Sequence, residues 1–140
     1  MRQLLLLFVA SLVAGCQTPL PPVDPQMAWV DFSTPTPGGK LLMAERLDNV
    51  RLNDGRFFQV TPGSHELRVR FDFEVFGGGG GLMTGPVERL CYLYIRYDHF
   101  EAGQRYQLQA GSIGFRPWAK LYDEQRNVVG QGTPAGCQRT

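Results

Sequence analysis

The chain has 140 residues, of which 43% are apolar and 19% are charged, so its composition is that of one globular domain and excludes a wholly disordered chain. Its 14 Lys and Arg residues nearly balance 13 Asp and Glu residues, which gives a formal net charge of +1. Without a basic excess, no nucleic-acid partner is expected. The 17 Gly and 10 Pro residues favour turns and strands over long helices.

The first 16 residues have the parts of a secretory leader in their usual order. Arg2 precedes an apolar run at 4–13, which is too short to span a bilayer as a helix, since a span takes about 20 residues. The run ends in Val13-Ala14-Gly15-Cys16, which resembles the lipobox of bacterial lipoproteins. The resemblance implies a lipoprotein signal peptide at 1–15 and acyl chains, palmitate among them, on Cys16.

The residue after this cysteine is Gln17, and not the Asp that usually retains a lipoprotein at the inner membrane. The resemblance therefore implies an outer-membrane lipoprotein that is anchored by its lipid and lies on the periplasmic face. The other interpretation is an ordinary secreted protein in which a cysteine follows the leader by chance.

A proline-rich segment follows the cysteine. Residues 17–26 contain four prolines, which neither a helix nor a central strand tolerates. We therefore expect 16–26 to be a lipidated, semi-extended tether of about 30 Å, at about 3.1 Å per residue. The folded domain is then expected at 27–140.

Strands are predicted along most of this domain. The clearest is 64–76, where apolar and charged residues alternate without a slip, so that one face is buried and the other is wet. Asn53-Asp54-Gly55-Arg56 predicts a hairpin turn, and 41–47 is ambiguous between a strand and a helical turn. Seven to nine short strands indicate a small antiparallel β-sandwich. The other predicted strands are 27–32, 49–52, 57–60, 88–97, 106–110, 118–122 and 127–131.

Two segments resemble the PEGA-type and carboxypeptidase-regulatory-like modules. The first is Val50-Arg51-Leu52-Asn53-Asp54-Gly55 followed by Val60-Thr61-Pro62-Gly63-Ser64-His65-Glu66-Leu67-Arg68-Val69, and the second is Phe100 to Leu108. The resemblance implies a prealbumin-like β-sandwich. Modules of this kind are mostly structural or binding units without shared catalytic residues. The five glycines at 77–81 depart from the pattern.

The three cysteines divide into one anchor and one pair. With Cys16 acylated, Cys91 and Cys137 remain as an even number in an oxidising periplasm, which predicts a disulfide. It would close a loop of about 46 residues and contribute roughly 4 kcal/mol through loop entropy. The residues around Cys137 are not expected to hold a strand, so the bond would pin a loose tail. The alternative is a buried free Cys91 and a loose Cys137.

No catalytic, metal or cofactor site is expected. There is no Cys-x-x-Cys, and the two histidines, His65 and His99, are far apart in the sequence. A hydrolase site could be imagined from Asp98, His99 and Ser112, but the serine lacks the strained elbow that such sites need. The simpler interpretation is that His65 packs in a turn and that Asp98 caps one.

Two features of the sequence suit a binding role. Leu82 and Met83 follow the five glycines with no charge nearby and form a candidate partner-contact loop. Tyr92, Tyr94 and Trp118 are candidates for an aromatic face opposite the core, which would suit glycan or protein binding. A covering loop or second sheet over these rings is the alternative, as is a fold of the loop back onto the core.

Together these observations predict a non-enzymatic outer-membrane lipoprotein that serves binding or envelope assembly. Its expected partners are the membrane, through the lipid anchor, and another envelope protein or peptidoglycan. Two alternatives remain from the sequence, namely an envelope hydrolase that uses Asp98 and His99, and a lipoprotein inhibitor or immunity protein.

Overall fold

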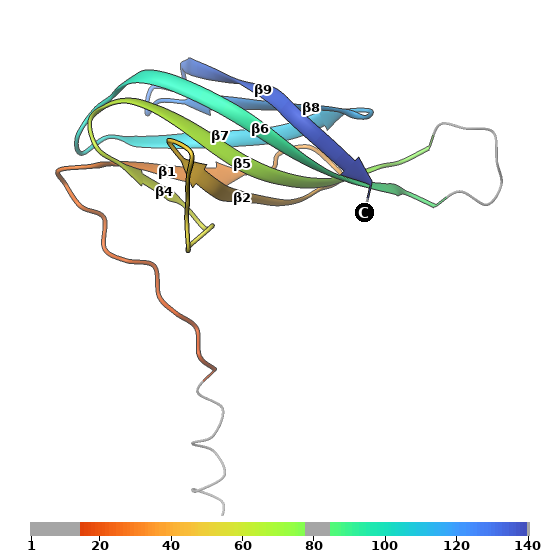
Figure 1. Ribbon diagram of the computed structural model, residues 1–140, viewed down its shortest axis with the longest axis horizontal. Coiled ribbons are helices and arrows are strands. Elements are labelled where there is room, and N and C mark those ends of the chain that lie inside the picture. The colour runs from red at the N-terminus through yellow and green to blue at the C-terminus, as the bar shows by residue number, and fades with distance from the viewer. Residues whose placement is uncertain (1–14, 78–84, 140) are drawn as a thin grey trace, which may run out of the picture.

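The computed structural model describes residues 15–77 and 85–139 (Figure 1). Within these residues the chain forms nine strands and no helix, which confirms the predicted all-β class. The described part of the chain accordingly holds no apolar helix of membrane-spanning length. The strands are β1 (Ala28–Ser33), β2 (Gly39–Leu47), β3 (Val50–Arg51), β4 (Phe58–Val60), β5 (Gly63–Val75), β6 (Val87–Phe100), β7 (Arg105–Ile113), β8 (Arg116–Tyr122) and β9 (Val128–Arg139).

The strands form one sheet in the order β3-β2-β5-β6-β9-β8-β7-β1-β4. The sheet folds over so that its two halves face each other as in a β-sandwich (Figure 1). β9 belongs to both halves, because 128–131 pairs with β8 and 132–139 pairs with β6. We call the half with β2, β3, β5 and β6 the β6 half, and the half with β1, β4, β7 and β8 the β7 half.

One strand pair departs from the predicted antiparallel arrangement. β1 and β7 are parallel, with Val30 opposite Tyr106, so the expectation of a purely antiparallel sandwich is wrong at this pair. β2 to β6 separate the two strands in the sequence, so no tight turn forces them to run in opposite directions. Backbone hydrogen bonds fix the start of β1 at the β6–β7 turn: Trp29 N–H donates to Gln104 O at 3.1 Å, and Gly103 N–H donates to Met27 O at 2.9 Å.

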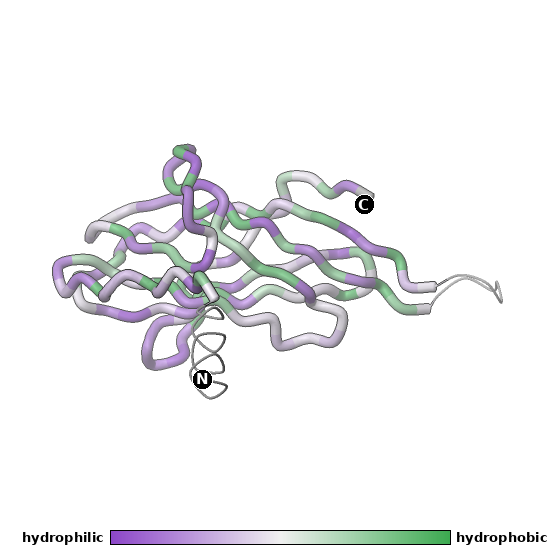
Figure 2. Tube along the Cα trace, turned by 90° about the horizontal axis from the view of Figure 1, so that it is seen from below, coloured by the Kyte–Doolittle hydropathy of each residue, from purple (hydrophilic) through white to green (hydrophobic). Residues whose placement is uncertain are grey.

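The core lies between the two halves and follows the period-two pattern of the strands. Along β5, Leu67, Val69, Phe71 and Phe73 are fully buried, whereas the residues between them are partly exposed. Figure 2 shows this alternation as changes of hydropathy along the chain. Each large apolar side chain buried in this way stabilises the fold by about 1.5–3 kcal/mol. The β7 half contributes Ala28, Val30, Phe58, Val60, Tyr106, Leu108, Ala110, Ala119 and Leu121 to the same cluster.

The predicted hairpin at Asn53-Asp54-Gly55-Arg56 is wrong. β3 pairs with β2, and β4 pairs with β1, so the two flanking strands lie at opposite ends of the sheet order. The tight turn lies earlier, at Asp48 and Asn49, whose φ angles of 47° and 66° suit a two-residue hairpin loop. The loop 53–56 instead runs along the edge of β2, where Ala44 N–H donates to Gly55 O at 2.8 Å.

The C-terminal segment is a strand that carries the predicted disulfide. Cys137 lies directly opposite Cys91 in the β6–β9 pairing, and their sulfur atoms are 2.09 Å apart, which is bonding distance. The expectation that the residues around Cys137 cannot hold a strand is wrong, because β6 supplies the backbone pairing that their side chains do not. Gly132 lets β9 lie close to β8, since a Cβ at this position would be 2.8 Å from the Cβ of Ala119.

Candidate functional site

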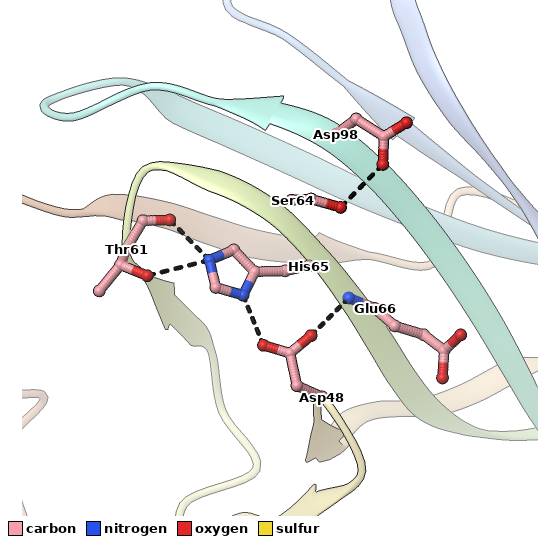
Figure 3. Close-up of polar contacts among 6 residues, drawn as sticks. All are labelled: Asp48, Thr61, Ser64, His65, Glu66 and Asp98. Atoms are coloured by element: carbon pink, nitrogen blue, oxygen red, sulfur yellow. Dashed lines mark hydrogen bonds and ion pairs between the residues drawn. The ribbon is translucent and has the colours of Figure 1, made fainter.

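The residues of the hydrolase alternative are not brought together. Asp98 accepts a hydrogen bond from Ser64 Oγ at 2.8 Å (Figure 3). His99 contacts the ring of Tyr97 edge-on, with centroids 6.1 Å apart. Among the described residues, no hydrogen bond joins His99 to Asp98 or to Ser112. The three residues therefore do not form a nucleophile–base–orienter arrangement of the kind that acyl transfer needs.

A different aspartate–histidine pair is assembled at one end of the β6 half (Figure 3). His65 Nδ1 lies 2.6 Å from Asp48 Oδ2, and His65 Nε2 lies 2.7 Å from the carbonyl oxygen of Thr61 and 3.0 Å from its Oγ1. The other Asp48 oxygen accepts the N–H of Glu66 at 2.8 Å. One ring therefore connects the β2–β3 turn, the β4–β5 turn and the start of β5.

This pair is built to hold turns together. A general base needs a ring nitrogen whose lone pair can reach a substrate proton, but His65 Nε2 faces a carbonyl oxygen and therefore has to donate. Partial burial raises the pKa of Asp48, but the hydrogen bonds from Glu66 N–H and His65 outweigh it and hold this pKa below its ordinary value of 3.8. His65 was predicted to pack in a turn, whereas Asp48 was not predicted, although its place beside Asn49 between two strands was an available signal of a tight turn.

The outer face of the β6 half gathers arginines and tyrosines in two rows across the strands. Register places these residues side by side although they come from four separate strands. On β5 and β6 their neighbours along the strand are buried core residues. This is the surface where the sequence placed Tyr92 and Tyr94. The first row is Arg51, Arg46, Arg68 and Tyr94, and the second is Met43, Arg70 and Tyr92.

Arg68 is the centre of this surface. Its guanidinium carbon lies 4.6 Å from the ring centroid of Tyr92 and 5.4 Å from that of Tyr94. Its Nε lies 2.8 Å from Glu45 Oε2. Cation–π contacts of this kind are worth about 0.5–1 kcal/mol at exposed sites. Arg68 therefore fixes both tyrosine rings and has its own charge balanced.

A hollow of about 220 Å³ lies beside Arg68, between the strands of the β6 half and the segment after β3. Arg70 lines the hollow. It donates two parallel hydrogen bonds to Asp72, from Nε to Oδ1 and from Nη2 to Oδ2, both 2.9 Å. Its Nη1 remains without a protein acceptor among the described residues. The side chains that line the hollow include Met43, Arg51, Leu52, Asn53, Arg70 and Tyr92.

On the outer face of the β7 half, the polar groups around Trp29 are satisfied within the protein. Trp29 is only 2% exposed and stacks on Phe57, with ring centroids 4.3 Å apart. Its Nε1–H donates to Asp31 Oδ1 at 2.8 Å, and Arg105 donates to the same carboxylate at 2.6 and 3.2 Å. Burial raises the pKa of Asp31, but the hydrogen bonds from Arg105 and Trp29 hold it below its ordinary value of 3.8.

Trp118, the third expected aromatic, lies in β8 and therefore apart from the two tyrosines in β6. It packs against β7, because a Cβ on Gly111 would come within 2.5 Å of a Trp118 ring atom. The predicted aromatic face is thus divided between the two halves.

The segment that precedes β1 touches the loop at 53–56. Cys16 is exposed and takes part in no disulfide. Asp54 accepts hydrogen bonds from Arg56 Nε, Nη2 and backbone N–H at 2.9, 2.7 and 3.0 Å, and Arg56 Nη1 donates to the carbonyl oxygen of Thr18 at 2.8 Å. The bonds from the Arg56 side chain, and then from its N–H, lower the pKa of Asp54 to about 2. Arg56 is thereby fixed where it meets Thr18.

Other candidate groups add no site within the described residues. Leu82 and Met83, the expected partner-contact loop, lie outside them. No group of three metal-ligating side chains occurs in 15–77 or 85–139. The chain matches no known protein-family model, no curated protein and no solved structure.

Proposed function

We propose that this protein is a non-enzymatic outer-membrane lipoprotein whose β-sandwich faces the periplasm and binds an envelope component. The observation that carries the proposal is the order of parts at the N-terminus. An apolar leader ends in the lipobox, Cys16 is exposed, and the exposed proline-rich segment separates it from β1. Several acyl chains, at about 0.8 kcal/mol per buried methylene, make a stable anchor.

The arrangement of the histidines supports a binding role over catalysis. Both ring nitrogens of His65 are engaged within the protein, and Asp98 is bonded to Ser64 and not to His99. The hollow beside Arg70 holds hydrogen-bond donors that have no acceptor among the described residues, which suits the binding of a ligand. The resemblance of 50–69 to PEGA-type modules, which are mostly binding or structural units, belongs to the same proposal.

The anchor is tested by Cys16→Ser in the full-length chain. The variant should lose all labelling by a radioactive or clickable palmitate and should stay uncleaved by lipoprotein signal peptidase, because the thiol is the acceptor of the lipid. Cys137→Ser is the matched control and should be labelled as the wild type is. Normal acylation and membrane retention of Cys16→Ser would refute the proposal.

Sorting is tested separately by Gln17→Asp. This variant should shift toward the inner-membrane fraction, because aspartate after the acylated cysteine usually retains a lipoprotein there. Gln17→Asn is the control of similar size and should stay with the outer membrane. An equal distribution of both variants would contradict sorting by this residue.

The hydrolase alternative is tested by His99→Ala and Asp98→Ala. When produced at wild-type abundance in a strain that lacks the protein, each variant should restore the wild-type phenotype. Failure of both variants with normal folding would favour the enzyme over the binding module.

A further inference from the structure

The hollow on the β6 half is lined by polar groups that the protein leaves unused. The side chains of Arg51 and Asn53 make no hydrogen bond or ion pair within the described residues, and the hydroxyl of Tyr92 makes none either. Arg70 adds its Nη1, since Asp72 occupies only Nε and Nη2. Donors that converge on one concave site without internal acceptors are the usual sign of a ligand site.

The charge around the hollow favours an anion. Arg51, Arg70 and Glu45 line the hollow. With Arg68, which pairs with Glu45, and Asp72, which pairs with Arg70, three arginines lie against two carboxylates, and three minus two leaves a local charge of +1. Both carboxylates are already paired, Glu45 with Arg68 and Asp72 with Arg70. Planar guanidinium groups bind carboxylates and phosphates through two parallel hydrogen bonds. The unpaired donors of Arg51 and Arg70 are therefore available to an acidic group.

The size and lining of the hollow favour a single sugar ring. Its volume of about 220 Å³ lies below the range of about 300–1,000 Å³ typical of pockets for drug-sized ligands. A protein partner instead needs a surface of about 800 Å² on each side. Met43 and Leu52 give the hollow an apolar wall beside the donors. A pyranose has this combination, with an apolar ring face and hydroxyl groups at its edge.

We propose that this hollow binds one anionic sugar unit of an envelope glycan, a pyranose that bears a carboxylate or a phosphate. Arg51 and Arg70 take the acidic group, Asn53 and the hydroxyl of Tyr92 take the sugar hydroxyls, and Met43 contacts the ring. This inference rests on the proposed binding function, for which it names the class of ligand. Arg68 is a positioning residue, because it holds the Tyr92 ring in place.

The test is calorimetric titration of the mature, acylated protein in detergent micelles with three small probes. The disaccharide N-acetylglucosaminyl-N-acetylmuramic acid carries a carboxylate, glucosamine 6-phosphate carries a phosphate, and chitobiose is neutral. At least one anionic probe should bind ten times more tightly than chitobiose, and its affinity should fall as sodium chloride is raised. The first two probes separate a carboxylate-bearing glycan from a phosphorylated one.

Two arginine variants locate the binding site. Arg51→Glu should weaken binding of the anionic probe at least tenfold, because it replaces the unpaired cation with a repelling charge. Arg116→Glu is the matched control, because Arg116 is also exposed and has no hydrogen bond or ion pair within the described residues. It should bind as the wild type does. Asn53→Ala should weaken binding without changing the unfolding midpoint.

Three results would overturn the inference. They are binding of chitobiose as tight as that of the acidic sugars, an equal loss in Arg116→Glu, and binding of a hexaglutamate peptide with no binding of any sugar, which would indicate a protein segment as ligand. The acylation of Cys16 is measured independently of these titrations. A protein that is normally acylated but binds no acidic sugar would refute the ligand and leave the anchor standing.

Discussion

The surroundings of Trp29 and the hollow beside Arg51 bring together the same kinds of side chain with opposite results. Around Trp29, the indole N–H and the guanidinium of Arg105 both end on the carboxylate of Asp31, and Phe57 covers the ring. Around the hollow, the donors of Arg51 have no acceptor within the described residues. The first region is filled by the protein's own groups, and the second is left open.

This difference separates stability from binding. Polar groups that are satisfied inside the protein contribute to the free energy of unfolding, because their removal leaves a partner unpaired. Groups that only water satisfies contribute little to stability and are available to a ligand. Substitutions in the filled region should therefore lower stability, and substitutions in the open region should lower binding.

The largest effect is expected from Trp29→Ala. It should lower the free energy of unfolding by about 3–5 kcal/mol, the usual range for removal of a buried large aromatic side chain. Tyr94→Ala on the open face should cost only about 1 kcal/mol, because this ring is half-exposed. Urea unfolding followed by circular dichroism measures both. Equal losses in the two variants would contradict the comparison.

The disulfide links β6 to β9, the strand that joins the two halves. Replacing both Cys91 and Cys137 by alanine should lower the free energy of unfolding by about 2–4 kcal/mol, because the bond restricts a long loop of the unfolded chain. The sequence separation of 46 residues supports a loss in this range. Reduction of the wild type with dithiothreitol is the control and should give a similar loss. An unchanged urea midpoint in both experiments would show that the bond is not stabilising.

The two histidines extend the comparison. His65→Ala should lower the free energy of unfolding by about 2 kcal/mol, since hydrogen bonds to charged groups contribute about 1.5–3 kcal/mol and Asp48 would lose its partner. His99→Ala should change it by no more than about 0.5 kcal/mol, as exposed substitutions usually do. Thermal or urea unfolding distinguishes them, and a larger loss for His99→Ala would reverse the assignment of roles.

Acid should lower the stability of the fold through two carboxylates, Asp31 beside Trp29 and Asp48 beside His65. The folded protein lowers the pKa of Asp31 and Asp48 below their ordinary 3.8. Such carboxylates stabilise the fold above the unfolded pKa, and this contribution is lost as the pH falls through the folded pKa. The free energy of unfolding should therefore decline below about pH 4 and change little between about pH 5 and 7. Asp31→Asn should show a shallower decline, and an unchanged acid profile would contradict the role of this carboxylate.

The smallest effect on stability is expected at the open region. Arg51→Ala should change the free energy of unfolding by no more than about 0.5 kcal/mol, because the side chain has no partner to lose. Urea unfolding checks this value beside the sugar titration. A loss above 1 kcal/mol would show that Arg51 has a structural role instead.

Much of the fold follows from local patterns in the sequence. The alternation at 64–76 predicted β5 to within one residue at each end. In β6, where 88–97 was the predicted strand, Cys91, Leu93 and Ile95 are completely buried. These strands are wet on one face, so period two is strong. β9 carries few large apolar side chains, so its strand at Cys137 gave no such pattern.

The sites could not be predicted in the same way, because they depend on pairing between distant strands. The hairpin expected at Asn53-Asp54-Gly55-Arg56 has suitable residues, but the carboxylate of Asp54 binds Arg56 and the loop follows the edge of β2. The hollow is lined both by this loop and by Arg70 of β5 and Tyr92 of β6, and no spacing along the chain encodes that arrangement. The pairing of Asp48 with His65 likewise crosses 17 positions.

The shared strand β9 also sets an order of assembly. It is synthesised after the other eight strands, yet its 12 residues pair with both β6 and β8. Until it arrives, each of these neighbours has an unpaired edge, which is the kind of edge at which chains aggregate. The hairpins β5–β6 and β7–β8 bring together residues near in sequence and so form early. Before β9 is in place, the chain therefore holds two incomplete halves, each with one edge strand open to pairing with another chain. The Cys91–Cys137 disulfide can form only when β9 has paired with β6 and covered that edge.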